Sequence, residues 1–143
     1  MIIEQVTSAN GTGEAVDALA RLIPQLSTVA PPDAATLAAL IAQPGCTLLI
    51  ARADDGTIVG ALTLTTYRIP TGLQARIDDV VVDVAARGDG VGEALSRTAL
   101  ERARAAGARS VTLTSRPSRA AANRLYERLG FLRVETTVYR YPL

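Results

Sequence analysis

Three glycines stand close together in the stretch "ARGDGVGEAL", residues 86–95. The stretch follows the apolar run "VVVDV" and precedes an amphipathic segment, so we expect a loop between a strand and a helix. At such a junction backbone N–H groups and the positive end of the helix dipole converge, an arrangement that suits a phosphate. Without side chains at Gly88, Gly90 and Gly92, an anion can come within hydrogen-bond distance of the backbone. A tight turn with a glycine N-cap explains the loop equally well.

Several familiar chemistries do not fit the chain. The loop lacks the Gly-Lys-Ser/Thr ending of a P-loop and the G-x-G-x-x-G spacing of a dinucleotide fold. The sequence contains no His and a single cysteine, Cys46. This composition excludes a disulfide framework, the usual zinc sites and any Ser-His or Cys-His nucleophile pair. We therefore expect no metal.

The elements that position the loop can be predicted along the chain. Periodicity and turn signals predict a strand at 1–7, helices at 13–26 and 34–42, and antiparallel strands at 46–53, 58–69 and 74–85. A helix at 90–106, a short strand at 110–115, a helix at 119–130 and one or two strands within 131–143 complete the pattern. No linker or repeat divides the chain, which predicts a single α/β (α+β) domain over residues 1–143.

The charge balance limits the partners. With 15 basic and 14 acidic residues the formal net charge is +1, so no broad field attracts nucleic acid or an anionic membrane. The start of the chain lacks signal-peptide features, and no segment approaches the roughly 20 apolar residues that span a bilayer. We expect a cytoplasmic protein without nucleic-acid or membrane partners.

Residues 77–131 resemble the GCN5-related N-acetyltransferase (GNAT) superfamily. The acetyl-CoA loop of that family, R/Q-x-x-G-x-G/A, is matched by Arg87, Gly90 and Gly92. A second family signature, L-Y-x-x-x-G-F, is matched by "LYERLGF" from Leu125 to Phe131. The resemblance implies the acyl-CoA N-acyltransferase fold, with a mixed central sheet of six to seven strands and four helices. It also implies that this sheet is splayed between its fourth and fifth strands.

The resemblance also implies where acetyl-CoA, the expected co-substrate, is bound. Its diphosphate would lie on the amides of the loop residues Arg87, Gly88, Asp89, Gly90, Val91 and Gly92. The pantetheine arm would run beside Val82 and Val84 as an extra strand, which requires unpaired backbone groups at those two residues.

Two residues of the last predicted helix complete the implied site. Tyr126 would lie near the CoA sulfur, where its hydroxyl can donate a proton or a hydrogen bond to the departing thiolate. Asn123, three residues earlier on the same face, would contact the pantetheine. An ordinary core tyrosine and a surface asparagine are the structural alternatives.

Direct attack of an amine on the thioester requires a neutral amine, so a base is useful. In the absence of His the candidates are carboxylates, and the "RIDDVVVD" strand supplies Asp78 and Asp79, expected on opposite faces. Some relatives carry an acidic base about where Asp78 falls, so Asp78 ranks first. Either carboxylate can instead pair with Arg68 or Arg76, and a chain of waters can equally remove the proton.

The sequence thus predicts an N-acetyltransferase that acts on a primary amine of a small molecule or peptide. The alternative is an acyl-CoA-binding sensor or regulatory module without turnover. The residues do not identify the acceptor or the acyl-chain preference. A homodimer is possible, with the final strands or the second helix as contacts.

Overall fold

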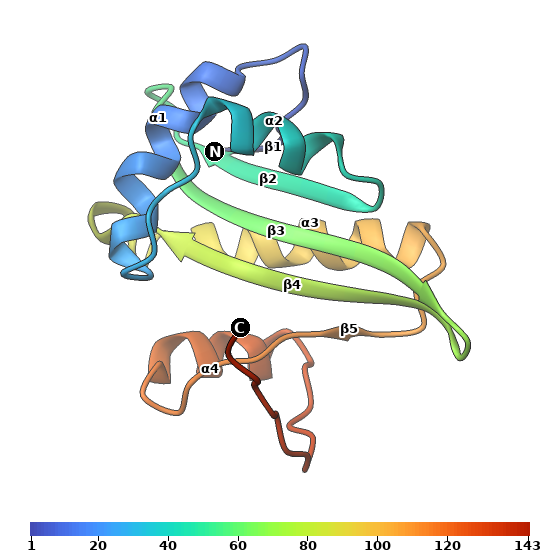
Figure 1. Cartoon of the computed structure of the whole chain (residues 1–143). Helices are drawn as coiled ribbons and strands as arrows, with labels where there is room; N and C mark the ends of the chain where they lie inside the picture. Colours follow the sequence, from blue (N-terminus) through green and yellow to red (C-terminus); the bar gives the residue numbers. More distant parts are fainter.

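A five-stranded mixed sheet with helices on both faces makes up the computed structural model, which describes residues 1–143 (Figure 1). The strands are β1 (Ile2–Gln5), β2 (Cys46–Arg52), β3 (Ile58–Ile69), β4 (Gly72–Val82) and β5 (Val111–Thr112). The α-helices are α1 (Thr12–Leu22), α2 (Ala34–Ala42), α3 (Val91–Ala105) and α4 (Ala120–Arg128). Two short 3₁₀ helices, η1 (Ile23–Gln25) and η2 (Val84–Ala86), follow α1 and β4. None of the helices is long and apolar enough to cross a bilayer.

The strands lie in chain order across the sheet. Neighbours from β1 to β4 are antiparallel, and β5 is parallel to β4. The Asp55–Gly56 turn joins β2 to β3, as its sequence predicts, because glycine there adopts a φ of 89° without steric cost. The long β3–β4 pair forms the centre of the sheet.

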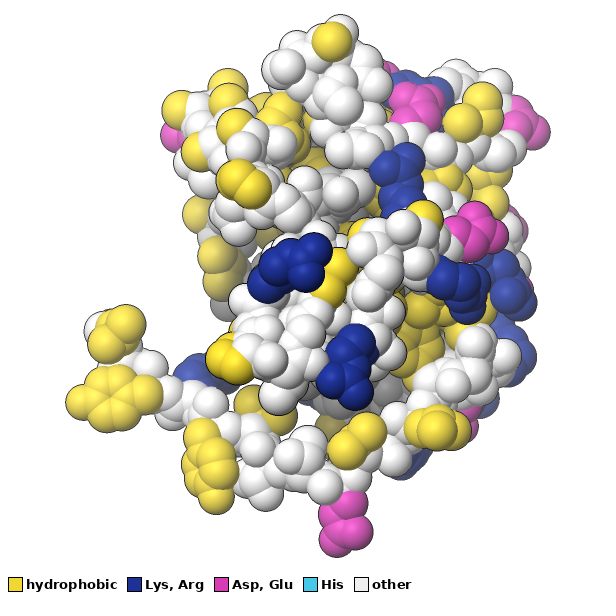
Figure 2. Space-filling model, turned by 90° about the vertical axis from the view of Figure 1, so that its right-hand side faces the viewer, with side chains coloured by type: hydrophobic (Ala, Val, Ile, Leu, Met, Phe, Trp, Pro, Cys, Tyr) yellow, Lys and Arg dark blue, Asp and Glu magenta, His cyan; other side chains and the backbone are white.

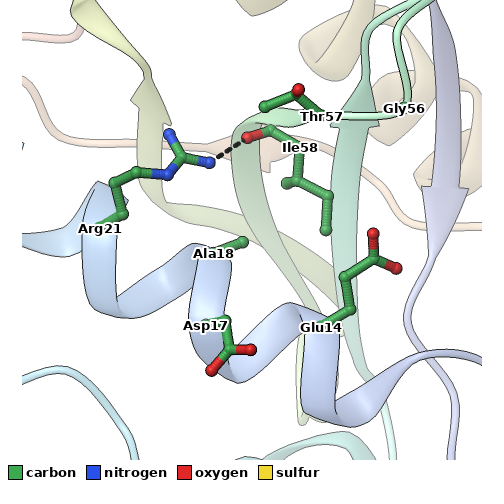
Figure 3. A pocket seen from close by; sticks show the side chains of 7 residues that line it. All are labelled: Glu14, Asp17, Ala18, Arg21, Gly56, Thr57 and Ile58. Carbon is green, nitrogen blue, oxygen red and sulfur yellow. Dashed lines mark hydrogen bonds between the residues drawn. The ribbon is translucent and has the colours of Figure 1, made fainter.

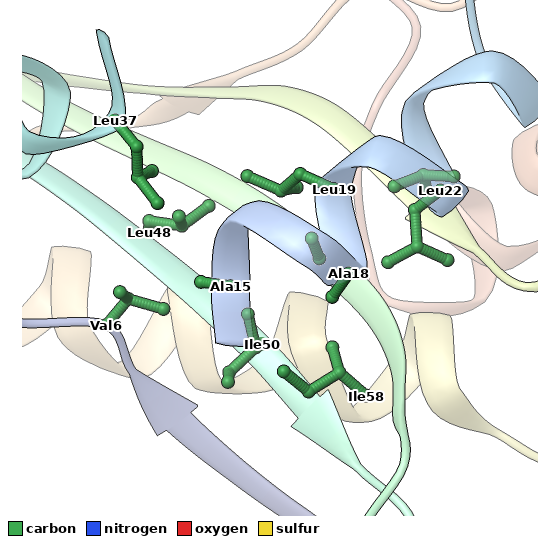
Figure 4. Packing of buried hydrophobic residues seen from close by; sticks show 11 residues of the cluster. Val6, Ala15, Ala18, Leu19, Leu22, Leu37, Leu48, Ile50 and Ile58 are labelled. Carbon is green, nitrogen blue, oxygen red and sulfur yellow. The ribbon is translucent and has the colours of Figure 1, made fainter. Parts of the chain in front are cut away.

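Two apolar clusters, one on each face, hold the helices to the sheet. The first lies under α1 and α2 and includes Leu19, Leu22, Leu37 and Leu48 (Figure 4). The second lies under α3 and includes Leu62, Ile77 and Leu95. Each fully buried leucine or isoleucine contributes about 1.5–3 kcal/mol.

The central strand β4 is packed on both faces, as its run of valines predicts. Val81 belongs to the cluster under α1 and α2, whereas Val80 and Val82 pack against the cluster under α3. A bulge opposite Leu62, where the register with β3 shifts between Ala61 and Thr63, changes which positions of β4 face α3: Ala75 and Ile77 before the bulge, Val80 and Val82 after it. The bulge contains Asp79, the one non-glycine residue with a positive φ, at 51°.

Three predicted elements differ from the structure. The helix expected at 13–26 ends as an α-helix at Leu22 and continues as η1, which contains Pro24. The strand expected at 110–115 pairs with β4 only at Val111 and Thr112. Residues 131–143 form no strand, so the sheet has five strands where six to seven were expected. The four expected helices are all present.

Candidate active site

The glycine loop between η2 and α3 is shaped by left-handed backbone at two positions. Gly88 has a φ of 89° and Gly90 a φ of 78°, values that side-chain-bearing residues rarely adopt. A Cβ atom at either glycine would meet no atom of the protein within 4 Å. These two glycines therefore serve the course of the backbone and leave open space over the loop.

The start of α3 has unpaired amides. Its N-cap is Gly90, which offers no side chain to cap the helix, and the first helical hydrogen bond runs from Ala94 N–H to Gly90 O at 3.0 Å. Within the loop only Asp89 N–H finds a backbone acceptor, Ala86 O at 3.4 Å, and the amides of Gly88 and Gly90 find none. Orphan amides at the positive end of a helix dipole are an anion-binding arrangement.

Gly92 brings three elements together. A Cβ atom there would stand 3.2 Å from Leu125 Cδ2 on α4 and 3.7 Å from Val82 Cγ2 at the end of β4. Its backbone φ is not in the left-handed region, so this glycine serves close packing rather than a turn. The glycine loop, the end of β4 and α4 therefore meet at one place.

β4 and β5 part soon after they meet. Their parallel pairing covers only Ala75↔Val111 and Arg76↔Thr112, so from Ile77 onward β4 has no partner on that edge. Asp83 N–H donates to Val59 O on β3. Because the backbone groups of successive strand residues point to opposite edges, the N–H and C=O groups of Val82 point toward the open edge. Val82 O accepts Arg87 Nε–H at 3.4 Å. The short register of β4 with β5 shows the splay that was expected between the fourth and fifth strands.

Val84 differs from expectation. It lies in η2 beyond the end of β4, and its amide donates to Gln25 Oε1 at 2.9 Å. The amide is therefore not free, and only the carbonyl oxygen of Val84 is left for a bound arm. The side chain is 64% exposed, so Val84 is not part of the core.

Tyr126 is the one buried residue of α4, only 6% exposed. Its ring packs edge-on against Phe131, with centroids 5.8 Å apart and planes at 70°. Burial raises the pKa of the phenol, an effect that the positive charge of Arg119 opposes. Tyr126 therefore keeps its proton at neutral pH, as a hydrogen-bond donor requires.

Asn123 lies one turn before Tyr126 and is half-buried. Its Nδ2 donates to Arg116 O at 3.1 Å, a bond that closes the segment leading into α4. This bond occupies part of the side-chain amide and leaves Oδ1 as the group able to meet a ligand.

The two candidate bases have different surroundings. Asp78 pairs with Arg76, whose Nε lies 3.1 Å from both carboxylate oxygens, and the two side chains are partly exposed. Asp79 is exposed, and its carboxylate makes no hydrogen bond or ion pair within the chain. Because the bulge interrupts the alternation of β4, the expectation of opposite faces does not apply at Asp79. The freer carboxylate is that of Asp79, the second-ranked candidate.

Sequence reasoning missed the contacts that tie α1 and η1 to the end of β4. Arg21 forms an ion pair with Asp83 and donates to Ile58 O at 2.6 Å, and Gln25 reaches Val84. These contacts join residues 37 to 62 positions apart, and no local pattern signals them. Asp83 accepts Ala85 N–H and caps η2, so its carboxylate has a structural role.

A shallow hollow lies beside Arg21, on the face of the sheet that α1 covers (Figure 3). Its volume is about 230 Å³, and it is lined by Glu14, Asp17, Ala18, Arg21, Gly56, Thr57 and Ile58. Arg21 spans it toward the Ile58 carbonyl. The hollow is separate from the edge where β4 and β5 part, so we assign the candidate site to that edge on its backbone geometry.

Comparisons with known proteins agree with this geometry. The profile of the acetyltransferase (GNAT) family matches residues 16–131. An acetyltransferase of Trypanosoma brucei is 26% identical, with a TM-score of 0.79 and 99% of both chains covered. A transcriptional regulator from Bacillus halodurans is 28% identical, with a TM-score of 0.74 and 98% of both chains covered.

A more distant structure shares the fold. An aminoglycoside acetyltransferase from an uncultured soil metagenomic sample is 21% identical, with a TM-score of 0.84 over 99% of this chain and 95% of the other. The search of curated proteins found no match. The family profile covers most of the chain, and it includes the glycine loop, both sides of the splay and Tyr126. The chain therefore belongs to the acetyltransferase (GNAT) family.

Proposed function

We propose that the chain is an acetyl-CoA-dependent N-acetyltransferase that acts on a primary amine of a small molecule or a peptide in the cytoplasm. The observation that carries the proposal is the meeting of two sets of unpaired backbone groups. The free amides of the glycine loop adjoin the open edge of β4 at Val82. A diphosphate followed by an amide-containing arm matches both sets in that order.

The loop and the strand edge would bind the co-substrate. Gly88, Gly90 and the first amides of α3 would hold the diphosphate, with Arg87 and Asp89 framing the loop. The Val82 amide would take a carbonyl of the pantetheine, which then extends along β4 toward the bulge. The Val84 carbonyl and Asn123 Oδ1 could add contacts, although the Val84 amide is already bonded to Gln25.

Acetyl transfer from a protonated amine requires two protons to leave the nitrogen, one before the attack and one after it, while one proton reaches the sulfur and the other goes to solvent. The amine nitrogen attacks the thioester carbonyl, the N–C bond forms and the C–S bond breaks. A neutral Tyr126 would protonate the sulfur and regain its proton from solvent. At pH 7 only about one part in a thousand of an alkyl amine with a pKa near 10 is neutral, which corresponds to a free-energy cost of roughly 4 kcal/mol. Asp79, Asp78 or a water chain would remove the proton from the amine.

A non-catalytic acyl-CoA-binding module is the second candidate. One observation favours it: the 28% identical structure from Bacillus halodurans has the same fold and is described as a transcriptional regulator. Such a module would use the same loop and strand edge. It would not need Tyr126 as a proton donor.

Thiol release from acetyl-CoA, measured across a panel of primary amines with the purified chain, tests the proposal. We expect amine-dependent release, and a Tyr126→Phe variant should lose activity while it binds CoA as tightly as the parent. CoA binding without turnover on any amine would favour the module. An absence of CoA binding would refute both.

A further inference from the structure

The sheet face that α1 and α2 cover is left open beyond their apolar cluster. On β3 and β4 that cluster includes only Ile58, Ala61 and Val81. Thr63 lies on the same face as Ala61, because side chains two positions apart on a strand point the same way. Asp78 is the cross-strand partner of Thr63 and shares that face, and both residues are half-buried. The face beside the bulge is therefore accessible, and its side chains are polar.

A row of polar side chains crosses this open face one step nearer the β3–β4 turn. Thr65, Arg76 and Thr112 lie side by side on β3, β4 and β5. Arg76 and Thr112 form the last pair before β4 and β5 part, and Figure 1 shows the two strands diverging beyond it. Arg76 therefore lies where the splay begins.

The guanidinium of Arg76 reaches forward into the splay. Its Nε lies 3.1 Å from both carboxylate oxygens of Asp78, and its Nη2 lies 3.4 Å from Thr114 Oγ1 on the other side of the opening. These contacts leave both N–H groups of Nη1 and one of Nη2 without a partner. The side chain is 37% exposed, so a ligand can reach these donors.

The free end of this guanidinium matches a carboxylate. Its two Nη atoms form a planar fork that can donate two parallel hydrogen bonds to the two oxygens. Asp78 already holds the fork in place, so little side-chain entropy is lost when an anion binds. The hydroxyls of Thr65 and Thr114 flank the fork and can donate further hydrogen bonds.

The charge at this end of the molecule also favours an anion. Arg68 and Arg109 lie beside the β3–β4 turn, and neither forms an ion pair with an acidic side chain. Figure 2 views the molecule from this end, with arginine side chains across the middle of the face and acidic side chains nearer its margin. The positive potential of these arginines offsets the charge of Asp78 near the fork.

We propose that the acceptor is a small amino acid, an amine that also carries a carboxylate a few bonds away, and that Arg76 binds this carboxylate. The assignment rests on the proposed function, which places the thioester beside the bulge of β4. Asp79 lies in that bulge, and its unpaired carboxylate attracts the ammonium end of the acceptor. From Arg76 to Asp79 the strand spans at most about 10 Å, and the Arg76 side chain covers part of that length. Arg76 is thus a specificity residue, and Asp78 positions it.

Matched acceptors test the proposal in the thiol-release assay. Linear amino carboxylates of increasing length, from β-alanine upward, are each compared with the corresponding amide, which keeps the amine and lacks the negative charge. We expect kcat/KM for at least one amino carboxylate to exceed that for its amide by about tenfold or more, because a charge-assisted pair is lost in the amide. If amines are acetylated with no preference for a carboxylate, this proposal alone fails. If no amine releases thiol, the proposed function fails with it.

Arginine variants assign the preference to one side chain. Arg76→Gln should remove the preference for the carboxylate over the amide. Arg76→Lys keeps the charge beside Asp78 but has no fork, so it should keep part of the preference, and it serves if the glutamine variant does not fold. Arg68→Gln is the control, because Arg68 lies three residues from Thr65 on β3 and therefore on the other face. It should keep the full preference. A full preference in the Arg76 variants, or its loss in Arg68→Gln, would overturn the assignment.

Discussion

Gly90 and Gly107, at the two ends of α3, make a matched pair that separates stability from binding. Both have a left-handed φ, 78° and 84°, and a Cβ at either would meet no atom within 4 Å. Alanine at either position should therefore cost about the same, roughly 1–2 kcal/mol of unfolding free energy, because the strain is local. Urea denaturation of the two variants measures this cost.

Only the Gly90 variant should lose affinity for CoA. Alanine at position 90 would relieve its strain by a shift of the backbone, and this shift would rotate the amides that begin α3. The same shift at position 107 would act on the far end of the helix, where Ala108 N–H bonds to Ala103 O. We expect Gly90→Ala to bind CoA at least about tenfold more weakly, a loss of roughly 1.4 kcal/mol. Titration calorimetry gives both affinities. Equal affinities for the two variants would refute the assignment of the loop.

Three further predictions follow from single contacts. Burial raises the pKa of Tyr126, so the neutral phenol stabilises the fold. The free energy of unfolding of the parent should therefore fall as the pH rises beyond about 10. Tyr126→Phe should lose less stability over the same pH range, as measured by urea unfolding. Asp33 is the N-cap of α2, and the hydrogen bond that it accepts from Thr36 N–H lowers the pKa of its carboxyl. The stability that this carboxylate contributes should therefore be lost as the pH falls through the lowered pKa. Asp33→Asn should make the free energy of unfolding less dependent on pH in the acid range. At Gly60 a Cβ would lie 2.8 Å from Val91 Cγ1. Gly60→Ala should therefore lower the free energy of unfolding by about 1–3 kcal/mol in the same assay. The control is Gly13→Ala, which should lower it by nothing, because a Cβ at Gly13 would meet no atom within 4 Å. A stable Gly60→Ala protein would contradict the close packing of α3 on β3.

The parts of the fold that sequence predicts well are those specified by local patterns. The Asp55–Gly56 turn and the run of apolar residues in β4 each depend on a few neighbouring residues, and both are present in the structure. Whether a segment pairs as a strand depends instead on the course of the neighbouring strand. The β-rich "SVTLTS" segment has the composition of a six-residue strand, but β4 turns away after two pairs.

The candidate site divides in the same way. The course of the glycine loop follows from its residue types, because Gly88 and Gly90 adopt a positive φ. The splay between β4 and β5 was expected from the family resemblance alone, and the two-pair register agrees with it. The bulge at Asp79 and the Gln25–Val84 bond depend on the three-dimensional arrangement, since no residue type requires either. The ranking of Asp78 above Asp79 rested on resemblance, and the Arg76 ion pair now gives a physical reason to test Asp79 first.

Amide hydrogen exchange with and without acetyl-CoA tests the central claim most directly. The account predicts new protection at Val82, Gly88, Gly90 and the first amides of α3, with little change at Val84, whose amide is already bonded. Protection elsewhere in the sheet with none in the glycine loop, or no change at any amide at saturating acetyl-CoA, would contradict it.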